Sequence, residues 1–178
     1  MAGEQTLLVK KDPRSDATAA DLVAQYKLLM QIRDRTTDAN DAVKTVRYVR
    51  QQADSYRGKV GPDSARYAEL VKALDSKISA MEAEIYQVQN QSSQDPLNFP
   101  IKVNNQIAAL AGVVGSTEAR PTRQSQVVFS KLTAELETYL VELRKAYKDL
   151  LPPVDEILRK NGHKAIEVKP QDTRRTAM

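Results

Sequence analysis

Apolar residues recur at alternating steps of four and three between positions 67 and 88, which is the clearest pattern in the chain. The positions that share this spacing are Tyr67, Val71, Leu74, Ile78, Met81, Ile85 and Val88. On a helix, this spacing places the apolar side chains in one stripe that a second helix must cover. Charged residues between them, such as Glu82 and Glu84, are expected to form a solvated surface.

A second apolar stripe follows residues 18–56 and predicts a long first helix. It consists of two rows at sevenfold spacing: Leu22, Leu29, Thr36 and Val43, then Ile32, Ala39, Val46 and Ala53. Thr18 and Asp21 resemble a capping box at its start, and Gly58 and Gly61 end it. At 1.5 Å per residue this helix would be about 55–60 Å long. The short glycine- and proline-containing connection makes it the antiparallel neighbour of the helix at residues 67–88.

Two main helices and a last short one are predicted beyond a polar loop at residues 90–100. Within the loop, Leu97 and Phe99 are the large apolar side chains, and we expect them to pin it to the end of the bundle. A short helix at residues 101–114 follows, and a long one begins after the N-cap residue Thr122. Pro152 and Pro153 are expected to kink or interrupt the long helix, because each removes a backbone donor, and a last short helix then reaches Gly162.

The fold class that we predict is therefore all-α: an elongated antiparallel bundle of three to four main helices at residues 17–162. Residues 1–16 form an N-terminal arm, of which residues 6–10 are apolar and β-prone before the stop at Asp12 and Pro13. A single strand leaves its own edges unpaired. The arm is therefore expected to be either a frayed segment or the last strand of a preceding β domain.

The composition agrees with helices and excludes several classes of site. The 178 residues form one domain by length, and they are 41% hydrophobic but only 5% aromatic, whereas sheets favour aromatic and β-branched residues. The absence of cysteine excludes disulfides, thiolate metal sites and cysteine nucleophiles. A single histidine, His163, excludes any site that needs two imidazoles.

The net charge of +4 is concentrated at the C-terminal end. From residue 159 onward there are six basic and two acidic residues, so the remainder of the chain is neutral. Residues 163–178 are expected to be a basic, disordered tail, because they contain little that can be buried. We favour a solvated terminus over a tail that binds an anionic partner, and we expect no nucleic-acid partner.

The helical stripes carry no recognisable catalytic or metal-binding pattern. Di-metal bundles need inward-facing Glu-x-x-His pairs, and no Glu stands three residues before His163. The glycines at 58 and 61 and at 112 and 115 lack the Gly-Lys-Ser/Thr ending of a phosphate loop. We expect no cofactor, no metal and no enzyme activity from this chain. No stretch approaches the roughly 18 apolar residues of a membrane span, and no signal-peptide pattern is visible.

Two asparagine side chains on the short helix are expected to need hydrogen-bond partners. Asn104 and Asn105 stand among small and apolar residues, directly after the loop that contains Pro96 and Pro100. Because buried amides must be hydrogen-bonded, we expect them to fix residues 95–100 against the helix. A role in ligand binding is the alternative.

Residues 94–114 (QDPLNFPIKVNNQIAALAGVV) and 119–125 (ARPTRQS) carry a family resemblance. Together with DPR at 12–14 and LLMQIRD at 28–34, they resemble the C-terminal helical region of bacterial proteins with BNR-repeat, sortilin-like β-propellers, often labelled glycosyl hydrolase or sialidase-like. The resemblance spans about residues 9–162. The interaction or loop-fixing residues expected in these blocks are Asp95, Asn98, Phe99, Lys102, Asn104, Asn105, Arg120 and Arg123.

In that family the propeller precedes the helical region and would carry any hydrolytic chemistry. The resemblance therefore implies a non-catalytic accessory domain that packs on an upstream propeller, periplasmic or secreted if it belongs to a longer exported precursor. The alternative is a free-standing coiled-coil adaptor that self-associates through its helical seams, as a homodimer. A hydrolase to which this chain contributes is the third reading.

Overall fold

The computed structural model describes residues 5–92 and 94–168, and these residues form an all-α bundle. The described part holds four α-helices and two short 3-10 helices. Their bounds are α1 Ala19–Ser55, η1 Gly61–Asp63, α2 Ser64–Ile85, η2 Asp95–Leu97, α3 Val103–Val114 and α4 Arg123–Lys160. The prediction of an all-α helical bundle is confirmed.

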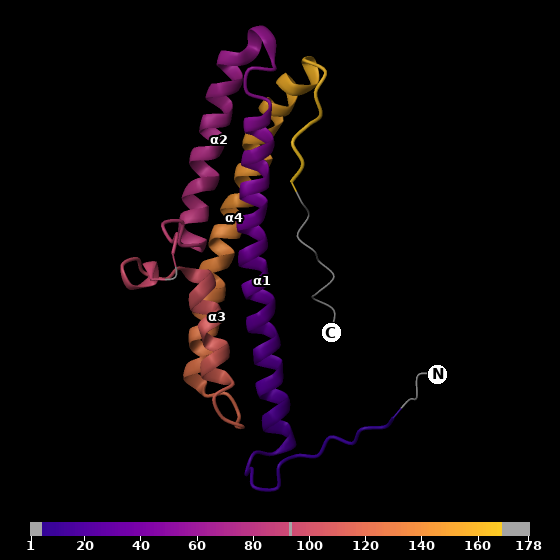
Figure 1. Cartoon of the computed structure of the whole chain (residues 1–178), viewed down its shortest axis with the longest axis vertical. Coiled ribbons are helices and arrows are strands. Elements are labelled where there is room, and N and C mark those ends of the chain that lie inside the picture. The colour runs from indigo at the N-terminus through magenta and orange to yellow at the C-terminus, as the bar shows by residue number, and fades with distance from the viewer. Residues whose placement is uncertain (1–4, 93, 169–178) are drawn as a thin grey trace.

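The bundle consists of two long helices and a third column that is divided in two (Figure 1). Helices α1 and α4 run in the same direction, and α2 and α3 follow one another in the opposite direction along them. At 1.5 Å per residue, α1 and α4 are each about 55 Å long, and α2 and α3 together reach about 50 Å. The connection at residues 86–102 leaves the column at the division and projects sideways.

One continuous core joins the helices. The apolar stripe of α2 is buried from Tyr67 through Val71, Leu74 and Ile78 to Ile85, and it packs more extensively against α4 than against its sequence neighbour α1. Helix α1 packs mainly on α3. The apolar stripe that the sequence predicts on α2 is therefore buried. Its principal packing partner is α4, whereas the sequence predicted the first helix as its neighbour.

Local signals place the helix ends close to the predicted positions. Thr18 and Asp21 form the capping box of α1, and the Thr122 hydroxyl accepts from the Ser125 amide at the start of α4. Helix α4 ends in a Schellman motif, in which the Gly162 amide donates to the Arg159 carbonyl and the His163 amide to the Leu158 carbonyl. Gly162 supplies the φ of +75° that this motif requires.

The expected interruption at the two prolines is wrong. Helix α4 continues through Pro152 and Pro153 to Lys160. The missing amides would have bonded to carbonyls four residues earlier, on Lys148 and Asp149, and both residues are exposed, so water can serve those carbonyls. Buried side chains on both sides of the prolines hold the helix to the bundle: Leu151, Val154, Ile157 and Leu158.

Two positions on α2 also differ from the expectation. Val88 lies beyond the end of the helix and is 46% exposed, so it does not extend the apolar stripe. Glu82, expected in solvent, is only 3% exposed. It stands four residues after Ile78, at the edge of the stripe, where the neighbouring helix covers it.

The segments outside the helices behave in two ways. Residues 6–10 form no strand in the described part of the chain, and Leu7, Leu8 and Val9 are all at least 75% exposed. By contrast, residues 163–168, predicted to belong to a disordered tail, contact the bundle and bury Ile166. The rest of the predicted tail, residues 169–178, lies outside the described residues.

Candidate functional site

Asp95 organises the loop between α2 and α3. Its carboxylate accepts hydrogen bonds from the amides of Gln91 and Ser92 and from the Ser92 hydroxyl, while its carbonyl accepts from the amides of Asn98 and Phe99. The amides of Gln91 and Ser92 lower the pKa of this carboxylate because they bond to its charged form. Asp95 thus holds the backbone of residues 91, 92, 98 and 99 in one turn.

Two contacts close the base of the loop. The side-chain amide nitrogen of Gln87 donates to the Pro100 carbonyl at 2.8 Å, and Gln87 is itself buried. Lys102 Nζ lies 3.3 Å from Glu84 Oε2 at the end of α2. The first contact joins the two ends of the loop to each other, and the second joins the end of the loop to α2.

The apolar residues of the loop are not pinned as expected. Leu97 is 82% exposed, and Phe99 is half-buried. Asn98 is also exposed. Leu97 is the last residue of η2, and its side chain points to solvent. Asp95 fixes the backbone of the same turn.

The two amides of α3 have different environments. Asn104 is buried, and its side-chain nitrogen donates to Asn40 Oδ1 on α1 at 3.2 Å. Its Oδ1 is buried without a hydrogen-bond partner among the described residues. Asn105 is exposed. The expectation that both side chains fix the loop is therefore wrong: Asn104 joins α3 to α1, because it lies one turn past the loop on the face that covers α1.

Arg120 acts at the opposite end of α3. Its Nε lies 2.7 Å from Asp21 Oδ1, so it joins the α3–α4 connection to the capping box of α1. Hydrogen bonds from Thr18 and then from Arg120 lower the pKa of Asp21 to about 2. Gln25 strengthens the same junction by donating to the carbonyls of Val114 and Thr117. Arg123 is exposed in the first turn of α4.

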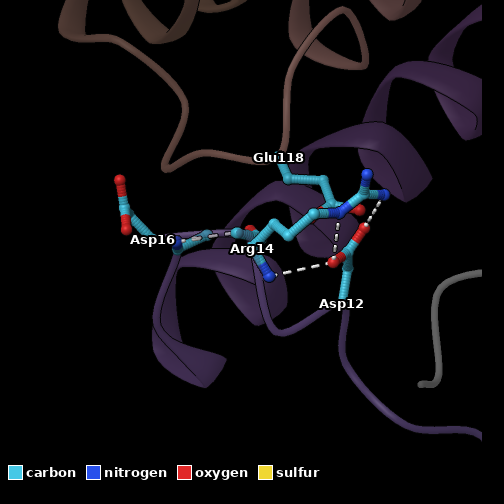
Figure 2. Close-up of a pocket in the computed structure, with 6 residues that line it drawn as sticks. Asp12, Arg14, Asp16 and Glu118 are labelled. Atoms are coloured by element: carbon cyan, nitrogen blue, oxygen red, sulfur yellow. Dashed lines mark hydrogen bonds and ion pairs between the residues drawn. The ribbon is translucent and has the colours of Figure 1, made fainter.

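An open pocket lies beside this junction (Figure 2). Figure 2 shows Glu118 from the α3–α4 connection next to Arg14 and Asp12 of the N-terminal segment, with Asp16 turned away. Arg14 donates to both oxygens of Asp12. This pair neutralises itself, and the carboxylates of Asp16 and Glu118 leave the pocket lining with a net negative charge.

The predicted site residues therefore form two groups at the two ends of α3. The loop group holds Asp95, Asn98, Phe99 and Lys102, and the junction group holds Arg120 and Arg123. Asn104 and Asn105 stand on α3 itself. The structure does not bring these residues together into one cleft.

An ionic network around the buried carboxylate of Glu82 was missed by sequence reasoning. Arg47 Nε lies 2.7 Å from Glu82 Oε1, and Arg50 Nη2 lies 2.9 Å from Glu82 Oε2. Arg50 also donates to Asp75 at 2.8 Å and to the Ser79 hydroxyl at 2.7 Å. The network joins α1 to α2 along one side of the apolar stripe and fixes their register. The sequence feature that could have revealed this network is a second row of polar residues on α2. Asp75, Ser79 and Glu82 recur at steps of four and three, each directly after a residue of the apolar stripe.

The network lies close to a buried tyrosine of α4. Burial raises the pKa of Tyr147, with Arg50 and Glu82 acting on it in opposite directions. The Tyr147 hydroxyl is buried without a hydrogen-bond partner among the described residues. On the outer side, the Arg47 guanidinium stacks 5.0 Å from the ring centre of Tyr86. The Ser79 hydroxyl donates to Asp75 within the same network, so every polar group of the network is used in joining α1 to α2 or in bonds along α2.

Within residues 5–92 and 94–168, no group of three or more His, Asp or Glu side chains is placed to hold a metal ion. None of the helices in this part of the chain is both long enough and apolar enough to cross a bilayer. Comparison of the chain with protein-family models, curated proteins and solved structures gives no match.

Proposed function

We propose that this chain is a non-catalytic helical interaction module that uses the loop at residues 86–102 to contact a protein partner. The observation that carries the proposal is the position of Leu97. Its side chain is 82% exposed at the end of a turn whose backbone is fixed by the carboxylate of Asp95. A large apolar side chain displayed on a preorganised loop is typical of an interface anchor, because little ordering is needed on binding.

The exposed N-terminal arm supports the same function. Leu7, Leu8 and Val9 are exposed in extended chain, which is the conformation that adds to the edge of a sheet. Following the resemblance stated above, the partner that we propose is a β-propeller domain that precedes the bundle. The propeller, and not this chain, would then carry any hydrolytic activity.

Photo-crosslinking in the source cells tests this proposal. A photoreactive amino acid at position 97 should crosslink to peptides of the preceding propeller domain, identified by mass spectrometry. The same group at Lys72, exposed on α2, is the matched control and should give no such product. An antibody against the bundle should detect a native band well above 19.9 kDa in the exported fraction.

Two results would contradict the propeller partner. A crosslink from position 97 to a second copy of this chain would support the self-associating adaptor instead. Equal crosslinking from positions 97 and 72 would show that the loop is not an interface. Release of a chromogenic sugar by the purified chain would contradict the absence of catalysis.

A further inference from the structure

The chain reverses direction after α4 and returns along the bundle. Gly162 makes the turn, and residues 163–168 run back beside α1 (Figure 1). This segment carries no assigned helix or strand. It is an extended peptide that lies on a surface formed by α1, the turn after it, and α4.

The surface holds the peptide mainly by its backbone. The side-chain amide of Gln52 on α1 pairs with residue 167 as a neighbouring strand would: its Nε2 donates to the Glu167 carbonyl and its Oε1 accepts from the Glu167 amide, each at 2.9 Å. Asp155 on α4 accepts from the Ile166 amide at 2.8 Å. These three bonds are made to main-chain atoms, so any residue could occupy positions 166 and 167 as far as the backbone is concerned.

Two side chains add selectivity. Ile166 is 6% exposed, so an aliphatic residue fills the position between the helices. The His163 ring contacts the Tyr56 ring at a tilt of 43°, with 5.0 Å between the ring centres, and its Nε2 lies 3.0 Å from the Lys59 carbonyl. Lys164, which lies between these two residues, and Glu167, which follows Ile166, are exposed. The side chains that contact this surface are therefore those of His163 and Ile166, three positions apart.

We propose that this surface is a binding site for an extended His-x-x-Ile peptide, which residues 163–168 occupy as a displaceable latch. The latch is joined to α4 through a glycine turn and buries one side chain, Ile166. Its first residue also closes the end of α4 through the bond from the His163 amide to the Leu158 carbonyl, so displacement disturbs at most this last turn and unpacks no helix face. Its short connection gives it a high effective concentration. A peptide in trans therefore competes poorly until the latch is weakened.

The test uses the full chain with Ile166→Asp and a labelled synthetic peptide with the sequence of residues 163–168. Fluorescence anisotropy should show binding at least about tenfold tighter to the variant than to the unchanged chain, because the site is then vacant. Val168→Asp, at an exposed position, is the matched control and should bind as weakly as the unchanged chain. A peptide with aspartate in place of its isoleucine should not bind.

A second substitution distinguishes binding at this site from nonspecific binding of the peptide. Adding Gln52→Ala to Ile166→Asp should weaken peptide binding by about tenfold, since two backbone bonds are lost. If the Ile166→Asp chain shows the helical circular dichroism of the unchanged chain but no saturable binding, the proposal is overturned. If that variant does not fold, Ile166→Ala takes its place, because it weakens the latch without placing a charge in the core. The folded Ile166→Ala chain must then bind the labelled peptide more tightly than the unchanged chain does, and equal binding overturns the proposal.

Discussion

Arg50 on α1 and Glu82 on α2 form an ion pair at the edge of the core, with 2.9 Å between Nη2 and Oε2. The Glu82 side chain is 4% exposed and the Arg50 side chain 32%. The carboxylate of this pair is therefore buried, whereas the guanidinium remains partly exposed to water. Arg47 holds the second carboxylate oxygen, so two cations compensate one buried charge.

Glu82→Ala is expected to lower the free energy of unfolding by about 1.5–3 kcal/mol, the range for hydrogen bonds to charged groups. The loss should stay below the roughly 3–5 kcal/mol of a fully buried broken pair, because both arginines keep access to water. Urea unfolding followed by circular dichroism measures it. Glu84→Ala, whose exposed pair with Lys102 is worth little, is the control. Equal losses in the two variants would contradict the role given to Glu82.

The apolar stripe of α2 makes a second prediction. Ile78→Ala or Leu74→Ala should cost about 2–5 kcal/mol, because both side chains are 1% exposed and would leave cavities against α4. Lys77→Ala, on the exposed side of the same turn, should change stability by less than about 0.5 kcal/mol. A small effect at Ile78 would mean that α2 is rotated about its axis.

Pro152→Ala is expected to stabilise the chain. Proline in a helix interior is about 3 kcal/mol less favourable than alanine, and alanine would restore an amide for the Lys148 carbonyl. Because part of that gain is offset by a more flexible unfolded chain, we expect about 1–2 kcal/mol in thermal or urea unfolding. Pro62→Ala, at the start of η1, needs no such amide and should give no gain. A loss of stability on Pro152→Ala would show that the proline serves α4.

Acid should weaken the junction at the start of α1. The pKa of Asp21 falls from an ordinary 3.8 to about 2 in the folded chain. A lowered pKa contributes stability above the ordinary value, and this contribution is lost as the pH falls from about 4 through 2. The difference in melting temperature between the unchanged chain and Asp21→Asn should therefore shrink over this interval. Arg120→Met should move the pH midpoint of this loss only part of the way back towards 3.8, because the hydrogen bond from Thr18 lowers the pKa of Asp21 more than Arg120 does. A difference that is independent of pH would contradict the assignment.

Leu97→Ala should leave stability within about 0.5 kcal/mol of the unchanged chain, because exposed substitutions away from caps and core have small effects. Asp95→Ala should instead release the turn, observed as faster hydrogen exchange at the amides of Gln91 and Ser92. A large stability loss at Leu97 would mean that its side chain packs on the bundle, as the sequence alone suggested.

The helices and their ends were predictable from the sequence. The four-and-three spacing from Tyr67 to Ile85 defines a buried stripe because side chains at these steps share one face of a helix. Thr18, Thr122 and Gly162 mark helix ends because their side chains or backbone freedom satisfy terminal amides and carbonyls. Such interactions reach no further than one or two turns, so neighbouring residues contain all the information that they need.

The tertiary structure decided what local spacing leaves open. Glu82 became buried because α1 brought two arginines to it, and α4 continued through Pro152 because apolar side chains on both sides were held by other helices. The docking of the segment that carries Ile166 depends on Gln52, which bonds to the backbone of Glu167 more than a hundred residues away in the chain. Of the candidate residues, Asp95 was anticipated as a loop-fixing residue, while Asn105 and Leu97 were assigned to contacts that the structure does not make. Local sequence determines which face of a helix is apolar, but only the assembled bundle determines which polar groups at the edge of that face meet a partner.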